Sequence, residues 1–402
     1  MLLSATVLTG CSAATTPDEG GGELTFVTWL TDDGLARWQT IADAFEEKTG
    51  THVEIENIPF ESYDQVVTSR IEAGNAPDIM QSVTEKQALL TGADLLEDLS
   101  DQPWVANEIS AVADFAPAYS DGKTFAFIPA LDSAGVFYNV DLFKAQGVEV
   151  PSTWDDFLDV VKTFRAAGIT PLAVGAKDGW PLNVQANEFA TSALAGSDET
   201  QKLADGDLSY ADSGWADIMS SWNDLIQAGG YNPEALGMDY NASAAEFAGG
   251  NAAMFIQGSF AIPSIRSAAP DLNMSVFPLP FGQEGDNAVA SVGYGSMLAV
   301  PKAAPNLTGA KAFLEFIADP AVLQPFLEKS AAFSGFTGIT PKLDPSLDAL
   351  ADLVASNSAE YNLAGGTGAA ANAAIATGVQ GLMAGTMTVD DVLASMDRAR
   401  DE

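Results

Sequence analysis

The first part of the chain alternates short apolar runs, rich in β-branched and aromatic residues, with longer segments of helical periodicity. We expect strands over residues 24–29, 53–55 and 76–80. Between them, residues 35–45 and 63–73 place apolar side chains three and four positions apart, as one face of a helix requires. This order of strands and helices builds a mostly parallel sheet with helices on its faces. The sequence therefore predicts an α/β domain from its first strand onward.

The same alternation restarts near residue 131. Residues 134–138 and 172–174 have the composition of strands, and residues 157–164 between them carry apolar side chains at helical spacing. Ser152 is placed to cap that helix, because a serine oxygen can accept a hydrogen bond from a free backbone N–H of the first turn. These features predict a second α/β domain.

Two later stretches, residues 290–294 and 335–339, resemble strands that pass between the two domains. Both are followed by further segments of helical periodicity. Several such crossings would form a hinge made of more than one strand. The last helix is expected to open at Thr388, with Asp391 three positions on as in a capping box.

The segment Leu8-Thr9-Gly10-Cys11 ends an apolar run that starts at Met1 and contains the single cysteine of the chain. It resembles a bacterial lipobox, in which a peptidase cuts before the cysteine and a diacylglycerol is attached to its sulfur. We therefore expect a signal peptide over residues 1–10, lipidation of Cys11, and a flexible tether over residues 11–22. The alternative is a buried N-terminal segment with a chance cysteine. Signal peptides open with Lys or Arg, and the first basic residue here is Arg37, so we expect the natural start to lie upstream.

Composition narrows the possible partners. The chain of 402 residues has 55 acidic and 17 basic residues, a formal net charge of −38, which opposes binding to nucleic acid or to anionic membrane surfaces. The charge is scattered, which is typical of a solvated and solubilising surface, although attraction of a cationic ligand is an alternative. Beyond the N-terminal run, no stretch approaches the roughly 18 apolar residues that span a bilayer.

The scarcity of histidine and cysteine excludes many kinds of enzyme active site. His52 is the single histidine, and Cys11 is assigned to lipid, so no His/Cys metal cluster, Ser-His-Asp triad or Cys-His pair can be assembled. The sequence also has no P-loop and no GxGxxG run. We expect no catalytic residues, no metal site and no cofactor.

Several local motifs occur in a characteristic order and spacing. Residues 137–143 read Phe-Tyr-Asn-Val-Asp-Leu-Phe, and residues 151–157 read Pro-Ser-Thr-Trp-Asp-Asp-Phe. Residues 76–79, 254–260 and 291–296 add shorter matches. Together the motifs resemble those of the extracellular solute-binding proteins of carbohydrate ABC importers, the family that contains the maltose-binding proteins. The similarity runs over essentially the whole mature chain.

The resemblance implies a two-lobed, type II periplasmic-binding-protein-like α/β fold, in which several hinge strands join two mostly parallel sheets flanked by helices. Lobe 1 is expected over residues 23–131 plus 292–333, and lobe 2 over residues 132–291 plus 334–402. A neutral mono- or oligosaccharide would bind between the lobes, which close and deliver it to ABC permease subunits. The protein would be a monomer on the extracellular face of the cytoplasmic membrane.

Sugar sites combine aromatic platforms with carboxylate and amide groups, and open α/β sheets bind ligands beyond the carboxyl ends of their strands. Among the candidates, Trp180 is the expected stacking platform and Asp132 the carboxylate at the first crossing. Trp29 and Trp154 are expected to pack in the core instead. The candidate ligand-binding residues are Asp32, Asp33, Gln81, Asp132, Trp180, Asn183, Gln257, Phe260, Gly293, Tyr294, Phe333 and Phe336.

Some of these candidates have alternatives. Asp32 and Asp33 follow the first strand and could simply cap the next helix. Phe260 stands where many relatives have tryptophan and could belong to the core. Residues 369–374 contain no ring, so one platform of the maltose-type pattern is missing.

Three other functions compete with sugar capture. The same fold could bind a non-sugar solute, such as a polyamine or other cation, a metal or an anion. An anchored glycoside hydrolase would need two carboxylates about 5 to 10 Å apart, and a chain this acidic provides such pairs by chance. A surface adhesin lacks support because the sequence has no repeats of the kind expected in a stalk.

Overall fold

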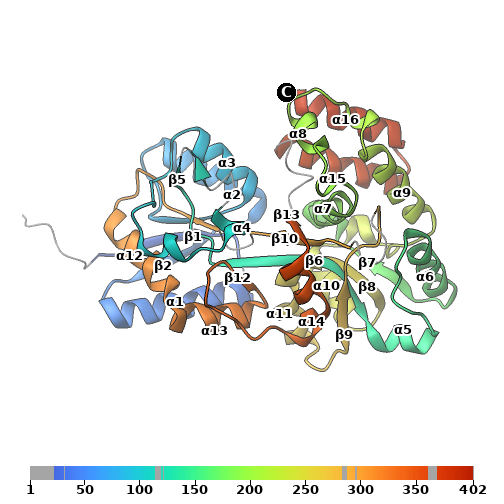
Figure 1. The fold of residues 1–402 in the computed structure, drawn as a ribbon, viewed down its shortest axis with the longest axis horizontal. Helices are drawn as coiled ribbons and strands as arrows, with labels where there is room; N and C mark the ends of the chain where they lie inside the picture. The colour runs from blue at the N-terminus through green and yellow to red at the C-terminus, as the bar shows by residue number, and fades with distance from the viewer. Residues whose placement is uncertain are drawn as a thin grey trace, which may run out of the picture.

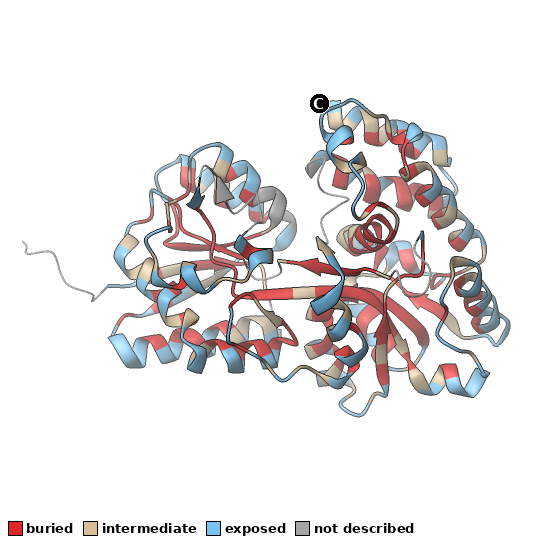
Figure 2. Ribbon diagram, viewed as in Figure 1, coloured by how far each residue is buried: buried red, intermediate tan, exposed pale blue. Residues whose placement is uncertain are grey.

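The computed structural model describes residues 22–30, 32–113, 119–120, 122–282, 288–294, 297–360 and 369–401. It consists of two lobes lying side by side, each built around its own sheet (Figure 1). Buried residues fill the sheets and the inward sides of the helices in both lobes, while the outward helix faces are exposed (Figure 2). The predicted two-lobed α/β fold is confirmed.

Lobe 1 has a four-stranded sheet in the order β11-β3-β1-β2. Strands β1, β2 and β3 run parallel, and β11 is antiparallel to β3. The elements of this lobe are β1 (Leu24–Thr28), α1 (Asp32–Thr49), β2 (Val53–Asn57), α2 (Phe60–Glu72), β3 (Ile79–Ser82), α3 (Thr84–Gly92), η1 (Pro103–Asn107), α4 (Ser110–Ala113), β4 (Tyr119–Ser120), β5 (Lys123–Thr124), β11 (Met297–Ala299), α12 (Leu307–Ala318), α13 (Pro320–Ser330) and β12 (Phe333–Ser334). The three strands predicted in the first part of the chain are therefore present and parallel.

Lobe 2 has a sheet in the order β13-β10-β6-β8-β7, with β9 also pairing β6. Its elements are β6 (Ala130–Asn139), α5 (Val140–Gln146), α6 (Trp154–Ala166), β7 (Thr170–Ala173), η3 (Ala176–Asp178), α7 (Trp180–Leu194), α8 (Glu199–Ala204), η4 (Tyr210–Asp212), α9 (Trp215–Gln227), η5 (Ala235–Gly237), α10 (Tyr240–Ala248), β8 (Ala252–Gly258), η6 (Ser259–Ala261), α11 (Ile262–Ala268), β9 (Met274–Phe277), β10 (Ala290–Gly293), η8 (Pro345–Leu347), α14 (Asp348–Ser356), β13 (Ser358–Glu360), α15 (Ala369–Ala384) and α16 (Val389–Asp401).

The sheet of lobe 2 is mixed rather than mostly parallel. Strand β6 is antiparallel to β8, β9 and β10, whereas β7 and β8 are parallel to each other. The reason lies in the path of β6, which enters from lobe 1 and runs along the sheet as the long strand between the lobes (Figure 1). Its first residues, Ala130 and Leu131, pair with β12 before the strand joins the others of lobe 2.

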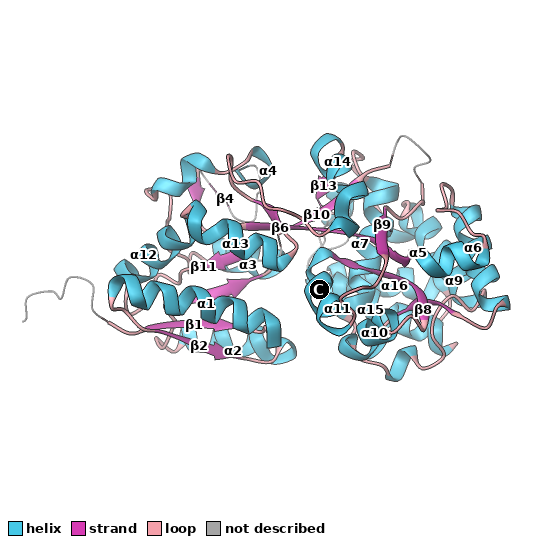
Figure 3. Ribbon diagram, turned by 90° about the horizontal axis from the view of Figure 1, so that it is seen from below, coloured by secondary structure: helices cyan, strands magenta, loops and turns pink. Residues whose placement is uncertain are grey.

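The chain crosses between the lobes at β6, between β10 and β11, and after β12. Strands β6 and β10 lie at the junction when the molecule is seen from below (Figure 3). The strand predicted over residues 335–339 does not form. Gly338 has a φ of 77°, in the left-handed region, and the chain turns there instead of continuing the strand.

Two local predictions about helix starts had different outcomes. The cap of α6 is Thr153, whose hydroxyl accepts a hydrogen bond from the Asp156 N–H at 3.1 Å, so the prediction of Ser152 was off by one residue. The capping box at the last helix is confirmed, because the N–H and hydroxyl of Thr388 both donate to the Asp391 carboxylate.

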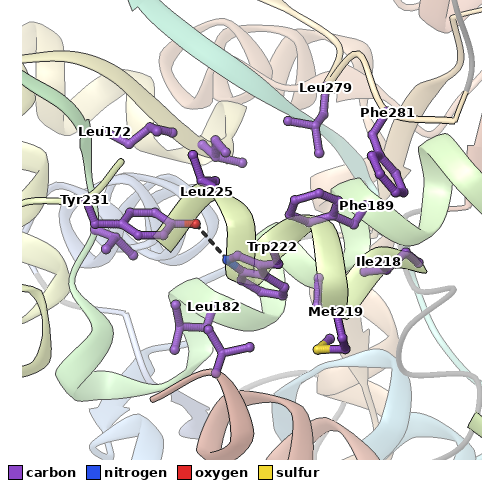
Figure 4. Close-up of a cluster of buried hydrophobic side chains, with 14 of the residues drawn as sticks. Leu172, Leu182, Phe189, Ile218, Met219, Trp222, Leu225, Tyr231, Leu279 and Phe281 are labelled. Atoms are coloured by element: carbon purple, nitrogen blue, oxygen red, sulfur yellow. Dashed lines mark hydrogen bonds between the residues drawn. The ribbon is translucent and has the colours of Figure 1, made fainter. Parts of the chain in front are cut away.

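The core of lobe 2 is dense in aromatic rings (Figure 4). Trp222 donates its indole N–H to the Tyr231 hydroxyl at 2.7 Å, and the same hydroxyl donates to the Gln185 side-chain oxygen at 2.6 Å. Trp154 packs on this core with its ring 5.2 Å from Phe157, as expected. The buried polar groups of Trp222, Tyr231 and Gln185 are therefore hydrogen-bonded to one another, and these bonds hold α7, which carries Gln185, against the core.

No helix among the described residues is both long and apolar enough to cross a membrane. The tetrapeptide ending in Cys11 lies outside the described residues.

Candidate ligand-binding cleft

A cavity of about 450 Å³ lies between the two lobes. Lobe 1 contributes the side chains Trp29, Phe60, Tyr63, Asp64 and Val83 to its lining. Lobe 2 contributes Lys177, Asp178, Gly179, Trp180 and Asn183, together with Ala373, Ala376, Thr377 and Gln380 from α15. Its volume is within the usual range for a small-molecule site, and its position between two domains is a common one for such sites.

The wall on lobe 1 is an aromatic cluster. The ring of Trp29, directly after β1, meets Tyr63 edge to face at 4.9 Å and 84°, and Phe60 at 5.6 Å and 71°. The Tyr63 hydroxyl donates to the Gln81 carbonyl at 2.7 Å and lies 3.1 Å from the Val27 carbonyl. Burial raises the pKa of Tyr63, so the hydroxyl stays protonated and keeps these bonds. The cluster therefore presents a fixed apolar surface to the cavity.

The wall on lobe 2 is built around Trp180. Gly179 has a φ of 76°, which turns the chain from η3 into α7 and places Trp180 at the first position of the helix. The Trp180 ring lies 4.7 Å from Tyr240 and 6.2 Å from Phe260. The backbone N–H of Tyr240 donates to Asp178 at 2.8 Å, which ties α10 to the turn before α7. Aromatic surface thus faces the cavity from both lobes.

Polar groups lie between these aromatic surfaces. The side-chain oxygen of Asn183 is buried and has no hydrogen-bond partner, although it belongs to a residue that lines the cavity. A ligand hydroxyl that donates to it would satisfy this oxygen. Gln380 is not available in the same way, because its amide donates to the Ala176 carbonyl at 2.6 Å.

Asp132 is half-buried at the start of the first crossing and is not part of the cavity lining. Its carboxylate accepts a hydrogen bond from the Ser259 hydroxyl at 3.4 Å. Loss of hydration raises the pKa of Asp132 to about 6, although the Ser259 bond and the charge of Arg37 act in the opposite direction. Burial likewise lowers the pKa of Arg37, opposed by Asp33 and Asp132. A carboxylate of lobe 2 and a guanidinium of lobe 1 thus attract each other across the junction.

The remaining candidates in lobe 1 lie away from the lined cavity. Asp32 is the first residue of α1, and the description does not extend to its side chain. Asp33 is exposed one position later. Gln81 is buried and accepts a hydrogen bond from the Thr28 hydroxyl. Phe336 is buried in the core of this lobe, with its ring 5.5 Å from Phe127.

The other candidates lie around the crossings. Gln257 is buried in β8, and its side-chain nitrogen has no partner. Gly293 ends β10 and pairs with Asp132, and Tyr294 follows it on a small apolar cluster. Phe333 is half-buried in β12. The structure thus brings Trp180 and Asn183 to the cavity, while the polar candidates at the strand ends are spread along the hinge.

Sequence reasoning missed Phe60, Tyr63 and Asp64, which open α2 just after β2 ends at Asn57. The rule that ligands bind beyond the carboxyl ends of strands could have found them, because β2 lies next to β1 in a parallel pair. No sequence pattern indicated that α15 lines the cavity, since its lining residues are small or neutral and lie far along the chain from the other lining residues. No group of three or more His, Cys, Asp or Glu side chains among the described residues could hold a metal ion.

Comparison with known proteins agrees with this geometry. The sequence profile of the family described as bacterial extracellular solute-binding protein matches residues 28–324. The chain belongs to this family. It is 23% identical over 329 residues to a multiple sugar-binding protein of Streptococcus mutans, which covers 78% of this chain and 75% of that protein. It is 24% identical over 342 residues to the melibiose/raffinose/stachyose-binding protein of Bacillus subtilis, covering 83% and 79%.

Solved structures show the same fold. A chitin oligosaccharide binding protein superposes with a TM-score of 0.83 at 22% identity, covering 94% of this chain and 98% of that one. A raffinose complex of the solute-binding protein RafE superposes with a TM-score of 0.78 at 21% identity, covering 94% and 99%. This extracellular solute-binding protein therefore belongs to a group of binding proteins rather than enzymes, which confirms the expectation of a function without catalysis.

Proposed function

We propose that this solute-binding protein captures a neutral sugar or oligosaccharide between its lobes, closes around it, and delivers it to the permease of an ABC importer. The main support is the cavity itself, which Trp29 and Tyr63 line from one lobe and Trp180 from the other. Sugar rings have apolar faces that pack on aromatic side chains, and their hydroxyls can donate to the free oxygen of Asn183. The names of the relatives, which bind melibiose, raffinose, stachyose or chitin oligosaccharides, agree with this class of ligand.

The remaining candidates have a place in the same proposal. Lobe closure would bring the hinge groups Asp132 and Tyr294 toward a ligand held at Trp180. The moving bodies would be lobe 1, residues 23–131 plus 292–333, and lobe 2, residues 132–291 plus 334–402, except that Phe336, which is buried in the core of lobe 1, would move with that lobe. The protein would act as a monomer, held at the extracellular face of the membrane by lipid on Cys11.

A thermal-shift panel tests the ligand class. The panel contains raffinose, stachyose, chitin oligosaccharides and their monosaccharides, each at 1 to 10 mM, with spermidine and putrescine as cationic competitors. A ligand at about 100 times its Kd stabilises a protein by about 2.7 kcal/mol, which is easily seen as a rise in Tm. A rise with one or more sugars supports the proposal. A rise with polyamines alone replaces it with the cationic alternative, and release of reducing ends during incubation replaces it with hydrolysis.

A further inference from the structure

A chain of hydrogen bonds runs through lobe 2 beside the strands that lead into the crossings. The Ser259 hydroxyl donates to Asp132 at 3.4 Å, and the backbone N–H of Ser133 donates to the Ser259 oxygen at 3.3 Å. The Ser133 hydroxyl donates to the Ser291 carbonyl at 2.8 Å, and the Ser291 hydroxyl is hydrogen-bonded to the carboxyl group of Glu188. These links connect the first crossing strand, β6, to β10, which leads into the second, and then to α7. A carboxyl group stands at each end.

Glu188 is the unusual member of this chain. Only 2% of its surface is exposed, and one of its two oxygens is buried without any hydrogen-bond partner. The carboxyl group is hydrogen-bonded to Ser291, whose hydroxyl also lies 3.3 Å from the Thr191 hydroxyl on the next turn of α7. An ionised carboxylate would need several donors to replace its hydration, and among the described residues Ser291 is the one donor to this group. The geometry therefore suits the neutral acid.

The charged groups around α7 do not stabilise the ionised form. The helix packs against β6, β8, β10, α9, α15 and η3. On these elements Asp217 and Asp224 of α9 are exposed acids, Asp178 and Asp132 are further acids, and Lys177 is exposed at the cavity. Burial raises the pKa of Glu188 to about 7, and the Ser291 hydrogen bond lowers it only in part. The group therefore titrates near neutral pH.

We propose that Glu188 is a positioning residue of the hinge: as a neutral acid it ties α7 to strand β10, and its ionisation loosens the second crossing. Strand β10 ends at Gly293, and the chain then passes through Tyr294 to β11 of lobe 1. A buried carboxylate favours arrangements in which α7 and β10 separate enough to admit water. Because β10 leads into the second crossing, a β10 that is held less firmly by α7 lets the relative orientation of the lobes vary more when Glu188 is ionised. This role rests on the proposed function, since closure of the same hinge traps the solute, but its test needs no ligand.

Spin labels on the two lobes measure this variation directly. Exposed Gln65 on α2 and exposed Asp390 on α16 are replaced by cysteine in a Cys11→Ala background, which leaves no other thiol. Pulsed electron–electron double resonance then gives the distribution of distances between the two labels at pH 5.5 and pH 8.5. We expect the distribution to be at least twice as wide at pH 8.5 in the parent, and narrow at both pH values in Glu188→Gln.

Two further variants sharpen the comparison. Ser291→Ala removes the bond to Glu188 and should give the wide distribution at both pH values. Glu246→Gln changes a part-exposed glutamate that bonds to Thr170 in the same lobe, and it should broaden with pH as the parent does. Equal widths at the two pH values in the parent, or the same broadening in Glu188→Gln, would overturn the role of Glu188.

A carboxyl titration of the wild-type protein gives an independent measurement that needs no variant to fold. With ¹³C-labelled glutamate, one side-chain carboxyl should titrate at least two pH units above the others, and assignment should place it at Glu188. A Glu188 carboxyl that titrates below pH 5.5 would also overturn the proposal. Because neither experiment contains sugar, a failure here leaves the proposed function intact, and a failure of the sugar panel leaves this role intact.

Discussion

The ring of Trp180 lies 4.7 Å from the ring of Tyr240, with 48° between their planes. Tyr240 in turn stacks at 6.3 Å on Phe255 of β8, so the half-buried tryptophan at the cavity is supported by a strand of the lobe 2 sheet. A platform held in this way costs little side-chain entropy when a ligand packs on it.

Replacing Trp180 with alanine removes that platform. We expect sugar affinity to fall by roughly 1 to 3 kcal/mol, as for other buried aromatic anchors, with the unfolding midpoint nearly unchanged. Calorimetric titration measures the affinity, using the sugar that raises Tm most. Leu236→Ala, at an exposed leucine of the same lobe, is the matched control and should bind as the wild type does. Equal affinities in the two variants would remove Trp180 from the site.

The ion pair between Arg266 and Asp344 should make stability depend on acid pH. Burial of Asp344 opposes ionisation, but two 2.8 Å hydrogen bonds from Arg266 and further bonds from Ser346 outweigh it and lower the Asp344 pKa to about 2. Because this pKa is below the unfolded value, the pair stabilises the fold above about pH 4 and loses this effect as pH falls toward 2. Asp344→Asn should lower the free energy of unfolding by about 2 kcal/mol at pH 7.

Urea unfolding at pH 7 and pH 3 tests whether stabilisation by this ion pair is lost as the pH falls. The difference between Asp344→Asn and wild type should shrink to about half at pH 3, where part of the wild-type contribution is already lost. A difference that stays constant or grows as pH falls would contradict the assignment.

Gly335 at the third crossing leaves no room for a side chain. A Cβ built there would lie 2.1 Å from the backbone oxygen of Ile128, and the backbone of Gly335 is held by hydrogen bonds to Pro129 and Ile109. Gly335→Ala should therefore destabilise the protein by about 3 kcal/mol, because backbone must move. Gly92→Ala, where nothing lies within 4 Å, should be neutral or slightly stabilising by the same denaturation measurement. Similar stabilities for both variants would show that the crossing is not tightly packed.

The proposed lipid anchor on Cys11 can be tested by the location of the protein in the cell. Cys11→Ala removes the sulfur that would carry the diacylglycerol, so the protein should move from the membrane fraction to the soluble extracellular fraction. Cell fractionation followed by immunoblotting measures this shift. Continued membrane attachment of the variant would rule out anchoring through Cys11.

Much of the fold could be predicted because burial imposes regular patterns. Strand β1 is buried at every position except Thr25, since Leu24 and Phe26 pack in one apolar cluster and Val27 packs in another, and this apolar run is visible in residues 24–28. Trp154 was correctly expected to pack, since it begins a helix whose apolar side chains follow at helical spacing. The mixed sheet of lobe 2 was not predicted, because strand direction depends on how β6 enters from lobe 1.

The cavity was predicted only in part. Trp180 and Asn183 open α7, which follows strand β7 after the short helix η3, so their place beyond the end of a strand could be predicted from the order of the elements. Trp29 was expected in the core, yet it both packs on Tyr63 and lines the cavity. A large aromatic side chain can do both, because one part of its ring packs on the core while another part faces the cavity. Glu188 gave no signal, since a buried acid in a helix looks like any surface acid until the neighbouring strand is placed.

Isothermal titration of the wild-type protein with the best sugar of the panel, repeated with Trp180→Ala, tests the central claim most directly. The account predicts one saturable site per chain with a Kd in the micromolar range, about −8 kcal/mol, weakened at least fivefold by the substitution. An absence of saturable binding to any neutral saccharide at millimolar concentration would contradict it.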